Sequence, residues 1–353
     1  MKLLRYLGQM LLALPLATTA WAQPASPPCD VKDLACMRHA LESHPARRLA
    51  TWNELFARPL VERVEPAPAA IVEYVNWDNA AQGFAERPRS TQAPAAFVNE
   101  VKAALADLPQ EVNLLFVDKV AGIFLVDELG GTGYGDIVTD DAGNAVGCFI
   151  VLDAGVLQRF TANEWATWKE STPFQPDGEW LLQARIERAA QDSRRNAIQY
   201  ILLHELGHVL TVGSALHPPW TVPPKDAGDP QDFTFSKLSW RLDGNRYVSL
   251  FDKDFTLRGD VAYYFGAKLP ASRMDETYAQ LAKTNFPSLY AATRPGDDFA
   301  EAFASYVHVV LLQRPWEITI WHGDELVRTF KACWDEPRCA EKRKVLRDLL
   351  RGP

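Results

Sequence analysis

An apolar run near the middle of the chain carries two histidines and a glutamate within five positions. The stretch QYILLHELGHVLTVG covers residues 199–213 and has the apolar character of a buried helix. Charged and imidazole groups are rarely buried without a partner. A fold that contains this run therefore has to bring partners to His204, Glu205 and His208, and the three side chains point to a chemical role.

The spacing of the two histidines predicts a metal site. Positions i and i+4 of a helix lie one turn apart on the same face, so His204 and His208 can direct their imidazoles to one ion. Glu205 can then point at a water on that ion. This is the His-Glu-x-x-His arrangement of zinc hydrolases. We expect Zn²⁺ to be bound by the two histidines, with Glu205 as the general base and Gly207 leaving room beside the metal.

A third ligand has to come from elsewhere, because a catalytic zinc usually has three protein ligands and one water. In the metzincin pattern a glycine and a further histidine follow within the next two turns. Thr211 and Ser214 occupy those places here, and His217 comes three residues late. That family is therefore disfavoured, and so is His217 as a ligand.

Better candidates lie in SLYAATRPGDDFAEAFASYVHVV, residues 288–310. Asp297 and Glu301 are four apart and share one face of the predicted helix. One of them can bind zinc while the other accepts the N–H of a ligating histidine. Asp298 points elsewhere on such a helix and is interpreted as a helix N-terminal charge. The residues alone leave Asp297 and Glu301 as alternatives.

The segment YAATRPGDDFAEAF resembles the second motif of the zinc peptidases related to anthrax lethal factor and to the Mlc titration factor peptidase. In those gluzincin-like enzymes a tyrosine stands seven residues before the acidic third ligand, as Tyr290 stands before Asp297. The resemblance implies a zincin-like domain, with Asp297 as ligand and Tyr290 polarising the substrate carbonyl. Those relatives usually have Glu where this chain has Asp297, so Glu301 stays the alternative ligand.

The wider pattern predicts one α+β domain with a small mixed sheet, an active-site helix and a second ligand-bearing helix. Residues 30–64 indicate two helices broken at His44–Pro45. Further helices are expected at 95–107, 177–211, 295–312 and 338–350, β-favouring runs at 112–117, 122–129 and 145–157, and a hairpin turning at Gly323–Asp324. The run AVGCFIVLD could be an edge strand that accepts an extended peptide or a central strand.

The glycine-rich stretch ELGGTGYGDIV does not match either phosphate-binding spacing. It is interpreted as a mobile loop between strands rather than a nucleotide site.

The N-terminus MKLLRYLGQMLLALPLATTAWA predicts a signal peptide, residues 1–22. Its apolar run is too short to span a bilayer and contains Pro15. We expect cleavage after Ala22 and export to the periplasm or the medium, with no membrane span in the mature chain. The expected organisation is an N-terminal helical segment, 23–108, packed on a catalytic domain, 109–353.

Cysteine usage fits an oxidising compartment. Cys29 and Cys36 lie close together in the sequence, as do Cys333 and Cys339, so two local disulfides are expected. Cys148 stands in a strand-like apolar run and is predicted to be a buried, inert thiol.

These observations predict an exported zinc metallopeptidase that acts on peptide or protein substrates. A net charge of −8 without a long basic block argues against nucleic acid as a partner. One alternative is a non-catalytic exported protein with a structural zinc, which would not need Glu205. The other is a zinc amidase that acts on cell-wall peptides.

Overall fold

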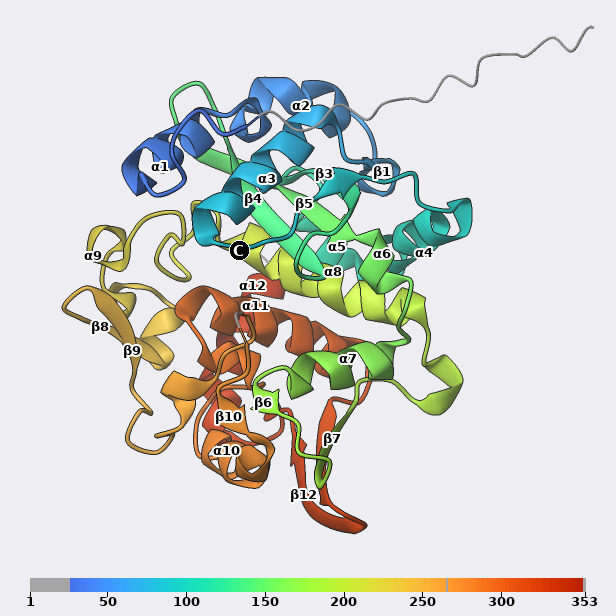
Figure 1. The fold of residues 1–353 in the computed structure, drawn as a ribbon, viewed down its shortest axis with the longest axis vertical. Helices are drawn as coiled ribbons and strands as arrows, with labels where there is room; N and C mark the ends of the chain where they lie inside the picture. Colours follow the sequence, from blue (N-terminus) through green and yellow to red (C-terminus); the bar gives the residue numbers. More distant parts are fainter. Residues whose placement is uncertain (1–25, 265, 352–353) are drawn as a thin grey trace, which may run out of the picture.

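The computed structural model describes residues 26–264 and 266–351, so the predicted signal peptide lies outside the described residues (Figure 1). The first half contains α1 (Leu34–Ser43), α2 (Leu49–Phe56), β1 (Val64–Pro66), α3 (Ala69–Gln82), β2 (Arg89–Ser90), α4 (Ala95–Ala106), α5 (Gln110–Leu114), β3 (Val120–Asp127), β4 (Gly133–Thr139), β5 (Ala145–Asp153), α6 (Ala154–Leu157) and α7 (Ala162–Ser171). The second half contains β6 (Phe174–Gln175), β7 (Trp180–Arg185), α8 (Arg194–Thr211), α9 (Pro224–Ala227), β8 (Trp240–Asp243), β9 (Arg246–Ser249), β10 (Leu269–Pro270), α10 (Met274–Leu281), α11 (Pro295–Tyr306), β11 (Glu317–His322), β12 (Glu325–Lys331) and α12 (Ala340–Arg351).

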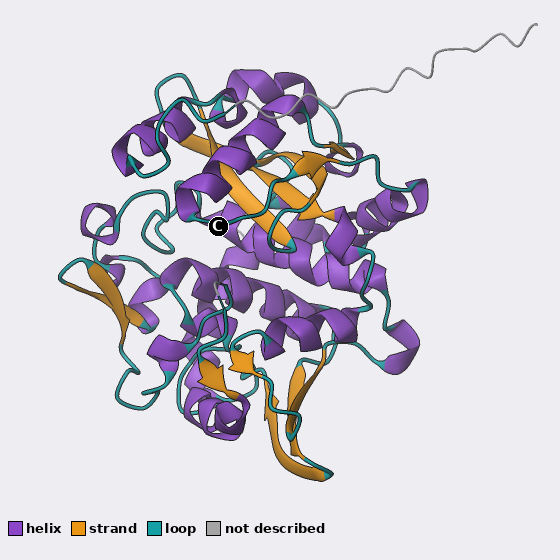
Figure 2. Ribbon diagram, viewed as in Figure 1, coloured by secondary structure: helices purple, strands orange, loops and turns teal. Residues whose placement is uncertain are grey.

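The fold is α+β, as expected, and its main sheet is mixed (Figure 2). The strand order is β1-β3-β5-β4, with β2 added against the end of β3. Strands β1, β3 and β5 run parallel, whereas β4 runs antiparallel to β5. The central strands β3 and β5 are almost continuously apolar because both of their faces are covered.

Two apolar layers cover the faces of this sheet. Successive side chains of a strand point to opposite faces, so Phe124 and Phe149 join the cluster formed with α2 and α3, above the sheet in Figure 1. Ile123 and Ile150 join the larger cluster beneath, which contains α4, α8 and α11. The helix with the two histidines is thereby held directly under the sheet.

The N-terminal segment is part of the sheet rather than a separate helical layer. Strands β1 and β2 come from it, and both pair with β3. The expected boundary at residue 108 therefore does not separate the N-terminal segment from the sheet, because strands from both sides of it pair with each other. The helices expected on either side of His44–Pro45 and at 95–107 are present as α1, α2 and α4.

Two other expectations were wrong in detail. Residues 110–114 form the short helix α5 instead of a strand, and Pro109 immediately precedes this helix. The expected helix at 177–211 begins only at Arg194, because residues 180–185 pair as strand β7 with β11. Of the two alternatives for the AVGCFIVLD run, the structure has the central strand, β5, and β4 is the edge strand beside it.

The C-terminal third follows its sequence pattern more closely. Strands β11 and β12 form the expected hairpin around Gly323, which has a positive φ of 56°. Helix α11 continues into a π-helical turn at Val307–Leu311. The closing helix α12 is present as expected.

Both expected disulfides are present, Cys29–Cys36 and Cys333–Cys339, and Cys148 is a buried free thiol. Burial raises the pKa of the Cys148 thiol well above its usual value, which makes it unreactive. In the described part of the chain, none of the helices has the length and apolar character needed to cross a membrane.

Candidate metal centre

Helix α8 carries both histidines and is buried along most of its length. The Ser193 side chain caps the helix by accepting from the backbone N–H of Asn196. The helix is buried on nearly all sides because the sheet lies on one face and α11 on another. Its polar residues therefore need partners from distant segments.

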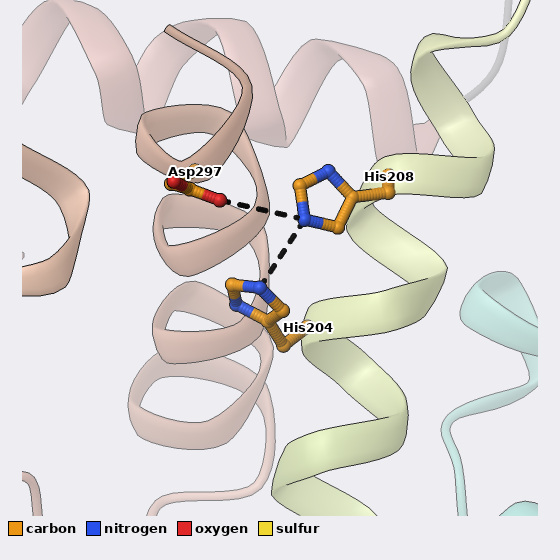
Figure 3. Close-up of side chains that lie close together, drawn as sticks. All are labelled: His204, His208 and Asp297. Carbon is orange, nitrogen blue, oxygen red and sulfur yellow. Dashed lines mark hydrogen bonds and ion pairs between the residues drawn. The ribbon is translucent and has the colours of Figure 1, made fainter. Parts of the chain in front are cut away.

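The imidazoles of His204 and His208 meet the carboxylate of Asp297 (Figure 3). The Nε2 atoms of the two histidines lie 3.2 Å apart, and Oδ1 of Asp297 lies 3.7 Å from Nε2 of His208. One ligand atom from each residue falls within 4.8 Å of the other two. Two imidazoles and one carboxylate are a ligand set typical of catalytic zinc, so these residues fit the expected ion.

Gly207 makes this convergence possible. A Cβ atom on Gly207 would lie 2.7 Å from Cα of Ala300 in α11. Real Cβ contacts are never this close, so only glycine allows the two helix backbones to approach at this point. Gly207 was expected to leave room beside the metal; it instead leaves room for the helix that carries Asp297.

Glu301 lies behind His204 rather than beside the other ligand atoms. Its Oε1 is 2.9 Å from Nδ1 of His204 and 2.6 Å from Nζ of Lys169, and its Oε2 accepts a hydrogen bond from Ser288 Oγ at 2.7 Å. Burial favours the protonated acid, but Lys169 and His204 outweigh it and hold the pKa of Glu301 well below its usual range. Glu301 thus stays ionised and orients the His204 ring.

Asp297 has neighbours that keep it anionic. Its Oδ2 accepts from Thr293 Oγ1 at 2.9 Å and pairs with Nε of Arg294 at 2.8 Å. Burial works to raise the pKa of this carboxyl, but Arg294 and the two histidines lower it below its ordinary value. Oδ1 is the atom directed toward His208.

The two imidazoles differ in their electrostatic surroundings. Burial and the neighbouring His204 lower the pKa of His208 to about 3, so this ring is neutral and can act as a ligand. Burial also acts to lower the pKa of His204, but the contact with Glu301 raises it above the ordinary value.

Glu205 packs against the edge strand of the sheet. A Cβ on Gly133 would lie 2.4 Å from Oε1 of Glu205, and a Cβ on Gly135 would lie 3.5 Å from Oε2. The glycine-rich stretch expected as a mobile loop is therefore partly strand β4, and it makes space for Glu205. Burial raises the pKa of Glu205 to about 7, partly offset by His204.

Tyr290 lies beside the candidate ligands. Its ring stacks on that of His204 with centroids 5.5 Å apart, and Lys169 Nζ lies 4.6 Å from the ring centroid on its face. The hydroxyl is hydrogen-bonded to Tyr264. Burial and Asp297 raise the pKa of Tyr290 well above 10, so the phenol stays protonated and can donate.

A cleft of about 480 Å³ opens over these groups. Strand β4 and the turn before it form one wall, and the rest comes from α3, α7, α8, Trp220 and the residues around Tyr263 and Tyr290. The lining includes the five predicted ligands and catalytic groups His204, Glu205, His208, Tyr290 and Asp297. Glu301 does not line it.

Two other sequence candidates are placed away from the ligand atoms. His217 hydrogen-bonds through Nδ1 to the carbonyl of Pro218 at 2.6 Å and is not part of the His-His-Asp group. Asp298 points away from the cleft, accepts from Trp240 Nε1 at 2.9 Å and forms a fully buried ion pair with Lys342. Asp298 is thus a buried anchor between α11 and α12 rather than only a helix-end charge.

Lys169 was not foreseen from the sequence. It lies on α7, 132 positions before the Glu301 that it contacts, and nothing in the local sequence WKES distinguishes it. Arg294 was present in the quoted motif but carried no signal of its own.

No protein-family model, curated protein or solved structure matches the chain.

Proposed function

We propose that this chain is an exported zinc-dependent metallopeptidase. The observation that carries the proposal is the meeting of His204, His208 and Asp297 at the floor of an open cleft, with Glu205 on the same helix. A non-catalytic structural site has no use for a buried carboxylate beside its ligands. Glu205 therefore favours an enzyme over a zinc-binding protein without activity.

Each residue of the site has a separate role in the proposed hydrolysis. His204, His208 and Asp297 would hold a zinc ion, which would supply Lewis-acid polarisation of a water molecule and of the carbonyl of the bond to be cut. Glu205, with its pKa near 7, is suited to take the proton of that water and deliver it to the leaving amine. Tyr290, which stays protonated, donates a hydrogen bond to the carbonyl oxygen as negative charge develops.

The sheet edge offers a place for a substrate backbone. Strand β4 pairs with β5 on one side, and its other side has an isolated bridge to Arg48 at Thr139, away from Gly133 and Gly135, which lie beside Glu205. An extended peptide can pair with such an edge as an added strand. This would lay a peptide bond across the cleft next to the proposed metal ion, which favours peptides over compact amide substrates.

Two further observations support the finer assignment. The arrangement of Tyr290, Asp297 and the two histidines agrees with the resemblance to gluzincin-like peptidases, which makes a zincin-like domain our proposal for the fold family. The two disulfides are consistent with an oxidising compartment and hence with export.

The test is the substitution Glu205→Gln in the zinc-loaded protein. We expect one zinc per chain to be retained, measured by elemental analysis, and cleavage of a peptide library to fall at least ~100-fold, because the proton acceptor is lost. Glu100→Gln is the control and should keep both properties, because Glu100 lies on α4, where it pairs with Arg194 at the start of α8. Undiminished cleavage by Glu205→Gln would remove the enzyme assignment.

A further inference from the structure

The cleft contains one cation with unused hydrogen-bond donors. Arg294 lines the cleft and its side chain is 67% exposed. Its Nε pairs with Oδ2 of Asp297 at 2.8 Å. In the described part of the chain, this side chain has no ion pair with a second carboxylate and no hydrogen bond to a carbonyl. A guanidinium has five donors, so most of them are left for another molecule.

Lys169, the other cation that lines the cleft, is not available in this way. Its side chain is only 14% exposed, and its ammonium is held by Glu301 at 2.6 Å and by Glu170 at 4.0 Å. A negatively charged ligand entering the cleft would therefore be attracted to Arg294.

The position of Arg294 sets where such a charge would lie on a substrate. The carboxylate of Asp297 contacts Arg294 through Oδ2 and faces His208 through Oδ1. The guanidinium therefore lies next to the candidate ligands, and only the carboxylate of Asp297 stands between it and His208. Because an extended chain advances ~3.3 to 3.6 Å per residue, a substrate charge at Arg294 is one or two residues from the bond that is cut.

Arginine is well suited to recognise a carboxylate. Its planar fork of N–H groups matches the two oxygens, and such charge-assisted pairs are stronger than neutral hydrogen bonds. The bond from Nε to Asp297 fixes the orientation of the fork and reduces the entropy lost on binding.

We propose that Arg294 binds a carboxylate of the substrate, so that the enzyme prefers peptides with a negative charge one or two residues from the scissile bond. This inference rests on the proposed peptidase function. The carboxylate has two sources, a free C-terminus or the side chain of Asp or Glu. A role confined to holding Asp297 in place is the competing explanation.

The experiment compares matched peptides on the zinc-loaded protein. One pair differs only in a C-terminal acid or amide, and a second pair only in Asp or Asn near the cleaved bond. We expect the charged member of at least one pair to have a kcat/KM about 10- to 100-fold higher, and the pair that responds identifies the source. In Arg294→Gln the ratio of kcat/KM for the charged peptide to kcat/KM for its uncharged partner should fall to about one.

Arg273→Gln is the matched control. Arg273 also pairs through Nε with a carboxylate three residues later, Glu276 at 2.7 Å, but it lies outside the cleft. It should keep the ratio. If Arg294 only positions Asp297, Arg294→Gln lowers both rates of a pair and leaves the ratio in place, which overturns the inference. A wild-type ratio of one in both pairs overturns it as well.

A binding measurement separates this inference from the proposed function. Calorimetric titration of the chelator-treated protein with the acid and amide forms of the same peptide does not depend on cleavage. We expect the acid to bind about tenfold more tightly, and Arg294→Gln to abolish the difference. If this holds but no peptide is cut, the peptidase proposal fails and carboxylate binding stands. Equal binding of acid and amide overturns the inference.

Discussion

Nδ1 of His204 lies 2.9 Å from Oε1 of Glu301, while Nε2 of the same ring lies 3.2 Å from Nε2 of His208. The ring therefore has a carboxylate on one side and the other imidazole on the opposite side. Glu301, already contacted by Lys169 and Ser288 as well, has no oxygen directed at the ligand group. This relationship favours Asp297 as the third ligand and gives Glu301 the task of orienting His204.

The division between the two acids predicts different effects on zinc affinity. Asp297→Ala removes a proposed ligand and should release zinc at chelator concentrations that the wild type withstands. Glu301→Gln leaves the ligands in place and should weaken binding only ~10- to 100-fold. Chelator competition measures both. The reverse order of effects would identify Glu301 as the ligand.

Gly133→Ala should reduce activity with little effect on stability. The new methyl group would lie 2.4 Å from Oε1 of Glu205, and the flexible Glu205 side chain can move away at small cost. The general base would then be displaced, so we expect kcat to fall at least ~10-fold with an unchanged melting temperature. Gly135→Ala is the control, because its methyl group would make only an ordinary contact at 3.5 Å. Equal activity of the two variants would contradict this account of the glycine-rich strand.

Gly207→Ala should damage both stability and metal binding. Its methyl group would collide with the Ala300 backbone, which cannot move without shifting α11. We expect the free energy of unfolding to fall by about 1 to 3 kcal/mol, with weaker zinc binding because Asp297 moves away with its helix. Urea denaturation and chelator competition measure the two effects. Ala300→Gly is the control: it should cost about 1 kcal/mol through helix propensity and keep zinc affinity.

The raised pKa of Glu170 predicts that the free energy of unfolding depends on pH. Burial raises the pKa of this carboxyl to about 7, against the opposing effect of Lys169. The folded state therefore retains a proton that the unfolded state releases above pH ~4.5. Its contribution to stability is fully present below pH ~4.5 and is lost as the pH rises through about 7.

The substitution Glu170→Gln isolates this effect. Glutamine can still accept the hydrogen bonds from Tyr278 and Tyr263, but it does not titrate. Relative to wild type, the unfolding free energy of the variant should rise between pH 5 and pH 8 by an amount on the order of 2 kcal/mol. Urea denaturation of the metal-free proteins at the two pH values measures this. A difference that does not change with pH would contradict the titration of Glu170.

Several features were predictable because they depend on residues close in the sequence. The i, i+4 spacing of His204 and His208 places both rings on one helical face. The cysteine pairs close short loops, and the turn at Gly323 brings β11 back as β12. For these features the local chain geometry restricts the possibilities before any long-range contact forms.

The predictions from the sequence were wrong where contacts with distant segments determine the local structure. Residues 180–185 have no strong alternation of their own and become β7 because β11, more than 130 positions later, pairs with them. The stretch around Gly133 reads as a loop, because the reason for its glycines is the side chain of Glu205 on another element.

From the sequence, two imidazoles and a carboxylate are expected on one buried helix, and Asp297 and Glu301 are the candidates for a third ligand. Only the tertiary structure separated those two acids. They lie on the same face of one helix, one turn apart, so their local patterns are equivalent. What distinguishes them is the position of α11 against α8, set by the contact of Gly207 with Ala300, which directs Asp297 toward His208 and Glu301 behind His204.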